Sequence, residues 1–223
     1  MQLMRWHRLA AWIGGTQLVI WIATGLAFSW FDFGAVRGTG DRLPAAPLDL
    51  GGVTLAPARA AELAGAPAAS VTLRMAGATP VYVVGGGDAD VAFDARGGQR
   101  VHIDADGAAA IARAGHRAHP ATRAAVTAAG AGDDVPLPAW RVPLGDARRT
   151  DVFVAAATGE IVAWRTATYR QFDFLWSLHT LGYVNRDMPS HAAMRVVTAL
   201  AALIALTGIL LLLRRLRRRR ETA

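Results

Sequence analysis

LAAWIGGTQLVIWIATGLAFSWF, residues 9–31, is a run of 23 residues without a formal charge. At about 1.5 Å per helical residue it is long enough to cross the roughly 30 Å hydrocarbon layer of a bilayer. The run is longer than the apolar segment of a signal peptide, ends in aromatic side chains and lacks a small-x-small cleavage motif. We therefore expect an uncleaved transmembrane helix here.

A second apolar run covers residues 192–213 and is interrupted only by Arg195, near its start. The long side chain of an arginine in this position can reach the headgroup region. Together the two runs account for the high hydrophobic content of 53%. They predict two membrane helices that flank the rest of the chain.

The net charge of +7 is concentrated outside the two apolar runs. Arg5 and Arg8 precede the first run, and six arginines follow the second between residues 214 and 220. The segment 32–190, in contrast, has 15 arginines and 16 acidic residues. Positive charge favours the cytoplasmic side of a membrane. We therefore expect a multi-pass protein of the bacterial inner membrane with cytoplasmic termini, a periplasmic centre and basic ends that bind lipid headgroups rather than nucleic acid.

The central segment predicts two successive lobes, each with one helix followed by antiparallel strands. In the first, residues 52–65 are predicted to form a helix, followed by strands in SVTLRMAG, TPVYVVGG and DVAFDARGGQRVHID. In the second, an alanine-rich helix at residues 104–115 precedes strands in AWRVPLG and TDVFVAAATGEIVAWRTATY. Gly97 and Gly159 are predicted to occupy corresponding turns. This pattern indicates an α+β fold class.

The predicted domain organisation follows from these segments. It consists of a cytoplasmic N-terminus (1–8), transmembrane helix 1 (9–31), lobe 1 (32–103), lobe 2 (104–170), an aromatic interfacial helix and linker (171–190), transmembrane helix 2 (191–213) and a basic cytoplasmic tail (214–223).

Several short motifs resemble a known family. VAFDARGG and VFVAAATGEIV are similar to the last hairpin of PepSY domains. RWHRLAAWIGG, ATGLAFSW, LWSLHTLGY and LTGILLLLRR resemble the ends of PepSY-associated transmembrane proteins. Some larger relatives, with four membrane helices, are associated with haem-dependent reduction of ferric siderophores, and other PepSY domains are propeptides that inhibit proteases. With two predicted membrane helices, the chain would be at most a haem-bearing subunit of a reductase and not an enzyme on its own.

Three histidines are expected at membrane boundaries: His7, His179 and His191. The resemblance implies that they are ligands of a b-type haem. His179 lies in FDFLWSLHTLGY, residues 172–183, an amphipathic pattern that predicts a helix in the outer interface. Its aromatic face combines Phe172, Leu175, Trp176, His179 and Tyr183. Two interpretations remain open, a polar tip in an aromatic belt or an axial ligand between flat apolar walls.

The expected membrane positions limit how these histidines can combine. His7 belongs to the inner boundary, whereas His179 and His191 belong to the outer one, about 30 Å away. Two imidazoles on one iron each lie about 2 Å from the metal, if the distance resembles other imidazole sites. Within one chain only His179 and His191 can therefore share a haem. His7 needs a second subunit, such as the partner in a homodimer.

The rest of the chain predicts no metal site and no catalytic residue. HRAH, residues 116–119, has the spacing of a helical metal pair, but Pro120 follows it and no acidic residue is near in the sequence. Cysteine is absent, which excludes thiolate-bound zinc, iron–sulfur clusters and thioether-linked haem. No nucleophile elbow, phosphate-binding loop or pair of catalytic carboxylates is apparent.

Two functions follow as hypotheses. The first is a PepSY-type accessory protein in membrane electron transfer or iron and haem handling, which binds b-type haem and works with another membrane or periplasmic protein or as a homodimer. The second is a non-catalytic periplasmic module that docks a partner protein or restrains a protease. The boundary histidines distinguish them, because only the first function needs a ligand set, whereas docking needs exposed strands and edges.

Overall fold

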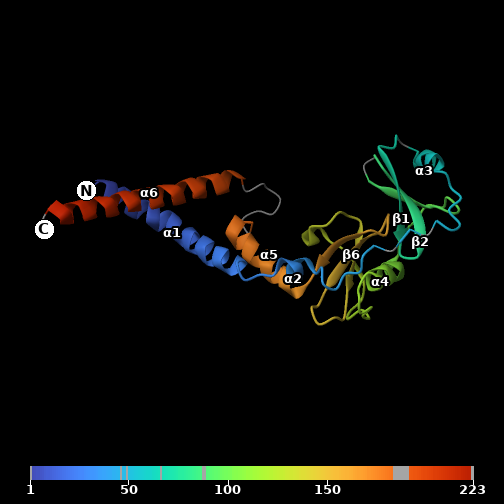
Figure 1. Cartoon of the computed structure of the whole chain (residues 1–223). Coiled ribbons are helices and arrows are strands. Elements are labelled where there is room, and N and C mark those ends of the chain that lie inside the picture. The colour runs from blue at the N-terminus through green and yellow to red at the C-terminus, as the bar shows by residue number, and fades with distance from the viewer. Residues whose placement is uncertain are drawn as a thin grey trace. The chain divides into compact units, whose positions relative to one another are not determined.

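The computed structural model describes residues 2–45, 47–48, 50–65, 67–86, 89–182 and 191–221, and the chain divides into two compact units (Figure 1). The helical unit comprises residues 1–32 and 170–223. The two-lobed unit comprises residues 33–169.

The helical unit contains α1 (Gln2–Phe28), most of α5 (Ala167–Thr180) and α6 (His191–Glu221). In α6, the segment Met194–Arg218 is long and apolar enough to cross a membrane. In α1, the segments Met4–Trp12 and Gly14–Phe28 meet the same criterion only together, and they are bent by 62°. One membrane-spanning helix is therefore supported by length and composition. The predicted basic tail is helical as far as Glu221, because leucine and arginine are good helix formers.

Helices α1 and α6 pack side by side and antiparallel, so that the first turn of α1 and the last turn of α6 lie at the same end (Figure 1). They approach closely at Gly14, where a Cβ atom would lie only 2.7 Å from Cδ2 of Leu200. The neighbouring Gly15 has no atom within 4 Å of its Cβ position. Gly14 thus provides the small surface that lets two apolar helices approach closely.

Helix α5 runs antiparallel to the second half of α1. The Phe28 ring contacts the Phe172 ring at 5.2 Å between centroids, and the Gln17 amide donates to the carbonyl of Leu178 at 3.2 Å. The bond from Gln17 satisfies a carbonyl that the end of α5 leaves without a helical partner. Of the predicted helix at residues 172–183, residues 172–180 are helical and pack lengthwise on α1. Leu181 and Gly182 form a turn, and Tyr183 lies outside the described residues.

The first lobe has α3 (Pro57–Ala64) packed on an antiparallel sheet of order β1-β2-β3, formed by Ser70–Ala76, Thr79–Gly85 and Val91–Asp94. The helix predicted at residues 52–65 starts only at Pro57, which lies in the first turn of α3, and Gly65 ends it with a φ of 69°. The core lies between the helix and one sheet face, around Ala60, Tyr82 and Phe93.

The second lobe has α4 (Ala105–Ala114) packed on a sheet of order β4-β5-β6-β7, formed by Thr127–Ala128, Ala139–Pro143, Asp151–Ala155 and Ile161–Arg165. The Asp104 side chain caps α4 by accepting from the backbone N–H of Gly107 at 2.8 Å. Ala108 and Ala112 face Val142, Val152 and Val154, so small helix residues meet branched strand residues in the core. Helix α2 (Phe33–Arg37) and the 3-10 helix η1 (Ala131–Asp133) complete this unit.

The described residues thus contain two antiparallel sheets, each covered by one helix, which confirms the α+β class. The two lobes resemble each other more in structure than in sequence. The predicted pairing of Gly97 with Gly159, however, was wrong by one residue. The backbone N–H of Gly98 donates to the Asp94 carbonyl, and that of Gly159 donates to the Ala155 carbonyl, both at 2.8 Å. Gly98 and Gly159 also share a positive φ, 75° and 70°. Gly98, rather than Gly97, is therefore the counterpart of Gly159.

Candidate functional site

The ring of His179 is held by a threonine of α1. Nδ1 of His179 lies 2.8 Å from the hydroxyl oxygen of Thr24, which is only 4% exposed. The same hydroxyl donates to the carbonyl of Ile20 at 2.7 Å. With the hydroxyl proton directed to the Ile20 carbonyl, the Thr24 oxygen accepts from the ring. Neutral His179 is then the Nδ1–H tautomer, with a lone pair on Nε2.

Aromatic side chains surround this imidazole. The ring of Phe28 meets it edge-on at 5.4 Å between centroids, and Trp176 stacks on it at 6.3 Å. The indole N–H of Trp21 donates to the backbone carbonyl of His179. The ring is thus fixed in orientation by packing on its sides and by hydrogen bonds at Nδ1 and at its own backbone.

The ring of His7 has the same arrangement with a threonine of α6. Nδ1 of His7 lies 2.8 Å from the hydroxyl oxygen of Thr207, and that hydroxyl donates to the carbonyl of Leu203 at 2.6 Å. The same argument assigns the Nδ1–H tautomer to neutral His7. A Cβ atom on Gly208 would lie 3.4 Å from Cε1 of His7, so the His7 ring packs closely against this glycine.

The two histidine–threonine pairs lie at opposite ends of α1, a helix of 27 residues. They cannot share one metal ion, in agreement with the membrane positions expected from the sequence. His191 is the first residue of α6, and its side chain lies outside the described part of the structure. Pairing of His179 with His191 therefore stays a prediction.

Thr24 and Thr207 are the residues that sequence reasoning missed. Each precedes a glycine, in ATGLAF and LTGILL, within motifs that resemble the ends of PepSY-associated transmembrane proteins. The useful signal was the repeated Thr-Gly pair within two apolar runs, because an intramembrane hydroxyl can bond an imidazole from a neighbouring helix.

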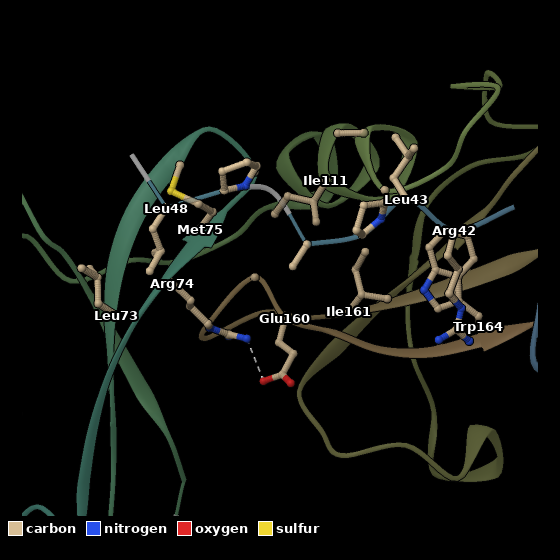
Figure 2. Close-up of a pocket in the computed structure, with 17 residues that line it drawn as sticks. Arg42, Leu43, Leu48, Leu73, Arg74, Met75, Ile111, Glu160, Ile161 and Trp164 are labelled. Atoms are coloured by element: carbon tan, nitrogen blue, oxygen red, sulfur yellow. Dashed lines mark ion pairs between the residues drawn. The ribbon is translucent and has the colours of Figure 1, made fainter. Parts of the chain in front are cut away.

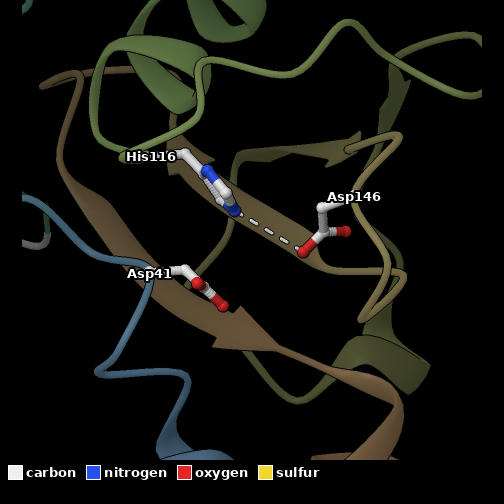
Figure 3. A group of neighbouring side chains, drawn as sticks. All are labelled: Asp41, His116 and Asp146. Carbon is white, nitrogen blue, oxygen red and sulfur yellow. Dashed lines mark ion pairs between the residues drawn. The ribbon is translucent and has the colours of Figure 1, made fainter.

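A third histidine, His116, belongs to a cluster in the second lobe. One ligand-type atom from each of Asp41, His116 and Asp146 lies within 4.8 Å of the others (Figure 3). His116 is 3% exposed, and its Nε2 is 3.5 Å from Oδ2 of Asp146. The backbone N–H of Ala118 donates to Nδ1 of His116 at 3.1 Å. The proton of the neutral ring is therefore on Nε2, the opposite tautomer to His7 and His179.

This tautomer favours an internal contact over a metal ligand at His116. A metal at Nε2 would need the lone pair there and a proton on Nδ1, which would then oppose the Ala118 N–H. Both carboxylates also have protein partners, because Asp41 pairs with Arg148 at 3.1 Å and Asp146 accepts from the Thr150 backbone N–H at 2.7 Å. We interpret the cluster as a structural contact that links three segments of the chain.

The HRAH motif does not form the helical pair that its spacing allows. Helix α4 ends at Ala114, and Nδ1 of His119 contacts the carbonyl of Arg113 at 2.8 Å. The acidic residues beside His116 come from distant parts of the chain, so the sequence argument that no acid is near was wrong in three dimensions.

In comparisons with known proteins, the chain matches no family model, no curated protein and no solved structure.

Proposed function

We propose that the chain is a PepSY-type accessory protein of the bacterial inner membrane that binds b-type haem through His7 and His179 and takes part in electron transfer or iron and haem handling. The observation that carries the proposal is that Nδ1 of each histidine lies 2.8 Å from the hydroxyl of a buried threonine, and that this hydroxyl also reaches a carbonyl of its own helix. With the ring proton on Nδ1, Nε2 presents a lone pair. Haem iron accepts an axial imidazole in this protonation state.

The residues fit the requirements of an axial haem ligand. A hydrogen bond from the non-ligating ring nitrogen fixes the tautomer and orientation of a metal-bound histidine. Thr24 and Thr207 supply that acceptor, and Phe28 and Trp176 add aromatic surface next to His179. When bound, the haem would supply one-electron transfer.

The location of the pairs supports the proposal if α1 and α6 both span the bilayer. At 1.5 Å per residue, Thr24 lies about 6 Å inside the end of α1, and Thr207 lies about 9 Å inside the end of the apolar run 192–213. A polar ring without a partner at such a depth is costly, and intramembrane ionisable side chains usually mark functional sites. The site at His179 would be completed by His191 or by another subunit, and the site at His7 by another subunit.

The proposed topology has both termini in the cytoplasm and the two-lobed unit in the periplasm. The apolar length of α6 and the arginines after it support this orientation. The same proposal includes a partner, which is either another membrane or periplasmic protein or a second copy of the chain.

The test is visible spectroscopy of the full chain, purified in mild detergent from haem-replete cells. We expect sharp reduced bands of low-spin haem, with part of the signal lost in His179→Ala and part in His7→Ala. His191→Ala reports whether that residue completes the outer site, and exposed His102→Ala is the matched control. A colourless wild-type protein that remains colourless after haem titration would contradict the proposal.

The alternative function, docking of a partner protein, is favoured by one observation on the first sheet. Strand β1 pairs only with β2 among the described residues, so its other edge is available for strand addition. A photo-crosslinking residue at exposed Thr72 of β1 should give one discrete adduct in cells, and the same residue at exposed Arg59 of α3 should not. Equal labelling from both positions, or none, counts against docking at this edge.

A further inference from the structure

The two-lobed unit contains a partly open cavity of about 860 Å³ (Figure 2). Its walls come from β1 of the first lobe, from α4 and β7 of the second lobe and from the segment after Arg42. Figure 2 shows Ile111, Ile161 and Leu48 around the central space. The lining is mostly apolar and includes Leu43, Leu48, Leu73, Met75, Ile111 and Ile161.

At one end of the cavity, Arg42 carries a charge without a counter-ion. Its guanidinium lies 5.2 Å from the centroid of the Trp164 ring, and one terminal nitrogen donates to the Arg37 carbonyl at 2.6 Å. Nε of Arg42 is buried and has no hydrogen-bond partner, and no carboxylate among the described residues pairs with this side chain. Burial lowers the pKa of Arg42 through desolvation, yet arginine remains protonated in proteins.

A second arginine lines the same cavity. Arg74 pairs with Glu160 at 2.9 Å and donates to the Thr158 carbonyl at 3.2 Å. Nε of Arg74 is also buried without a partner. The cavity therefore has two guanidinium groups and one carboxylate in an apolar lining. An unpaired charge that has lost part of its hydration is destabilising, and an anion in the cavity would offset that cost.

We propose that this cavity binds a small carboxylate with an apolar body. The carboxylate would bind the terminal N–H groups of Arg42 that the Arg37 carbonyl leaves free, and the apolar body would lie against the leucine and isoleucine side chains. The volume is within the range of pockets that enclose small organic ligands. The site lies wholly within the two-lobed unit and is independent of any haem at His7 or His179.

The test uses the full chain in lipid nanodiscs and the water-soluble probe 4-phenylbutyrate, with neutral 4-phenylbutyramide as its uncharged analogue. We expect calorimetric binding of the carboxylate and at least about tenfold weaker binding of the amide, because a charge-assisted hydrogen bond is lost. Arg42→Gln should lower the affinity for 4-phenylbutyrate by a similar factor. The matched control is Arg117→Gln, since Arg117 is exposed and does not line the cavity, and it should bind like the wild type.

A second variant tests the cavity itself without touching the charge. Ala114 is exposed at the last turn of α4 and lines the cavity, so Ala114→Phe should fill part of the space and reduce binding. Thermal unfolding of each variant identifies any that has lost its fold, and Ala114→Phe then decides the outcome if Arg42→Gln is unfolded. The proposal is overturned if the carboxylate fails to bind at millimolar concentration, if the amide binds equally well, or if a folded Ala114→Phe binds like the wild type.

Discussion

The Thr24 hydroxyl oxygen lies 2.8 Å from Nδ1 of His179 and 2.7 Å from the carbonyl oxygen of Ile20, so it links the ring of α5 to the backbone of α1. The pair His7–Thr207 repeats this relationship between α1 and α6. His116 has the reverse arrangement, because a backbone N–H already occupies its Nδ1. The positions of these hydrogen bonds distinguish His7 and His179, whose Nδ1 meets a threonine hydroxyl, from His116, whose Nδ1 meets a backbone N–H.

The first prediction concerns the protonated ring nitrogen. In the haem-free full chain at a pH where the rings are neutral, ¹⁵N-histidine NMR should show His7 and His179 as Nδ1–H tautomers and His116 as the Nε2–H tautomer. Assignment by single His→Gln variants identifies each signal. An Nε2–H tautomer at His179 would remove the main support for its role as a ligand.

The second prediction concerns the two threonines. Thr24→Val keeps the side-chain shape but removes the acceptor, so haem affinity at the His179 site should fall about 10- to 100-fold, as when other outer partners of metal ligands are lost. Thr207→Val should do the same at the His7 site only. Haem titration of both variants measures the two effects, and Thr72→Val, which removes an exposed hydroxyl from β1 outside the helical unit, should bind like the wild type.

The third prediction concerns the contact between α1 and α6. Gly14→Val places a branched side chain where even Cβ would be 2.7 Å from Leu200, so overpacking should destabilise the helix pair by about 1–3 kcal/mol. Gly15→Val makes the same change in helix propensity at a position with no atom within 4 Å. Unfolding in mixed detergent micelles should therefore be easier for Gly14→Val alone. Equal loss in both variants would mean that the close approach at Gly14 contributes nothing.

The fourth prediction concerns the buried carboxylate of the second sheet. Asp151 is 2% exposed and pairs with Arg123 and, at 2.7 Å, with Arg141. Asp151→Asn should lower the free energy of unfolding by about 1.5–3 kcal/mol, which is the usual contribution of a hydrogen bond to a charged group. The loss should stay in that range because both arginines are partly exposed to solvent. Urea unfolding of the full chain in nanodiscs, followed by near-UV circular dichroism, measures it. Asp90→Asn, at an exposed carboxylate, should change stability by less than about 0.5 kcal/mol.

Much of the fold could be predicted because its signals are local. Pro57 and Gly65 mark the ends of α3 through their own backbone preferences, and alternating branched residues mark β2 and β6. The misplaced turn shows the limit of such signals. Of the two adjacent glycines, Gly97 and Gly98, only the hydrogen bond from Gly98 to Asp94 identifies the residue that adopts the positive φ.

The candidate site was predicted only in part for the same reason. His7 and His179 stand out in the sequence as polar rings beside apolar runs, and the aromatic pattern around residue 179 predicts a packed helix. Their threonine partners do not stand out, because a threonine in an apolar helix ordinarily bonds its own backbone. Asp41 and Asp146 beside His116 were missed because both acids reach the histidine only after the second lobe has folded.

Apolar length, charge distribution and turn residues were thus sufficient to predict an α+β chain with two lobes and a membrane-type helix after them. Tertiary structure decided the tautomer of each histidine, because the group that contacts Nδ1 determines whether that nitrogen carries the ring proton. For His7 that group is 200 residues away, on Thr207, whereas for His116 it is the N–H of Ala118, two residues along the chain. The residue type is the same at all three sites, and the hydrogen-bond partner brought by packing or by a local turn determines whether Nε2 carries a proton or a free lone pair.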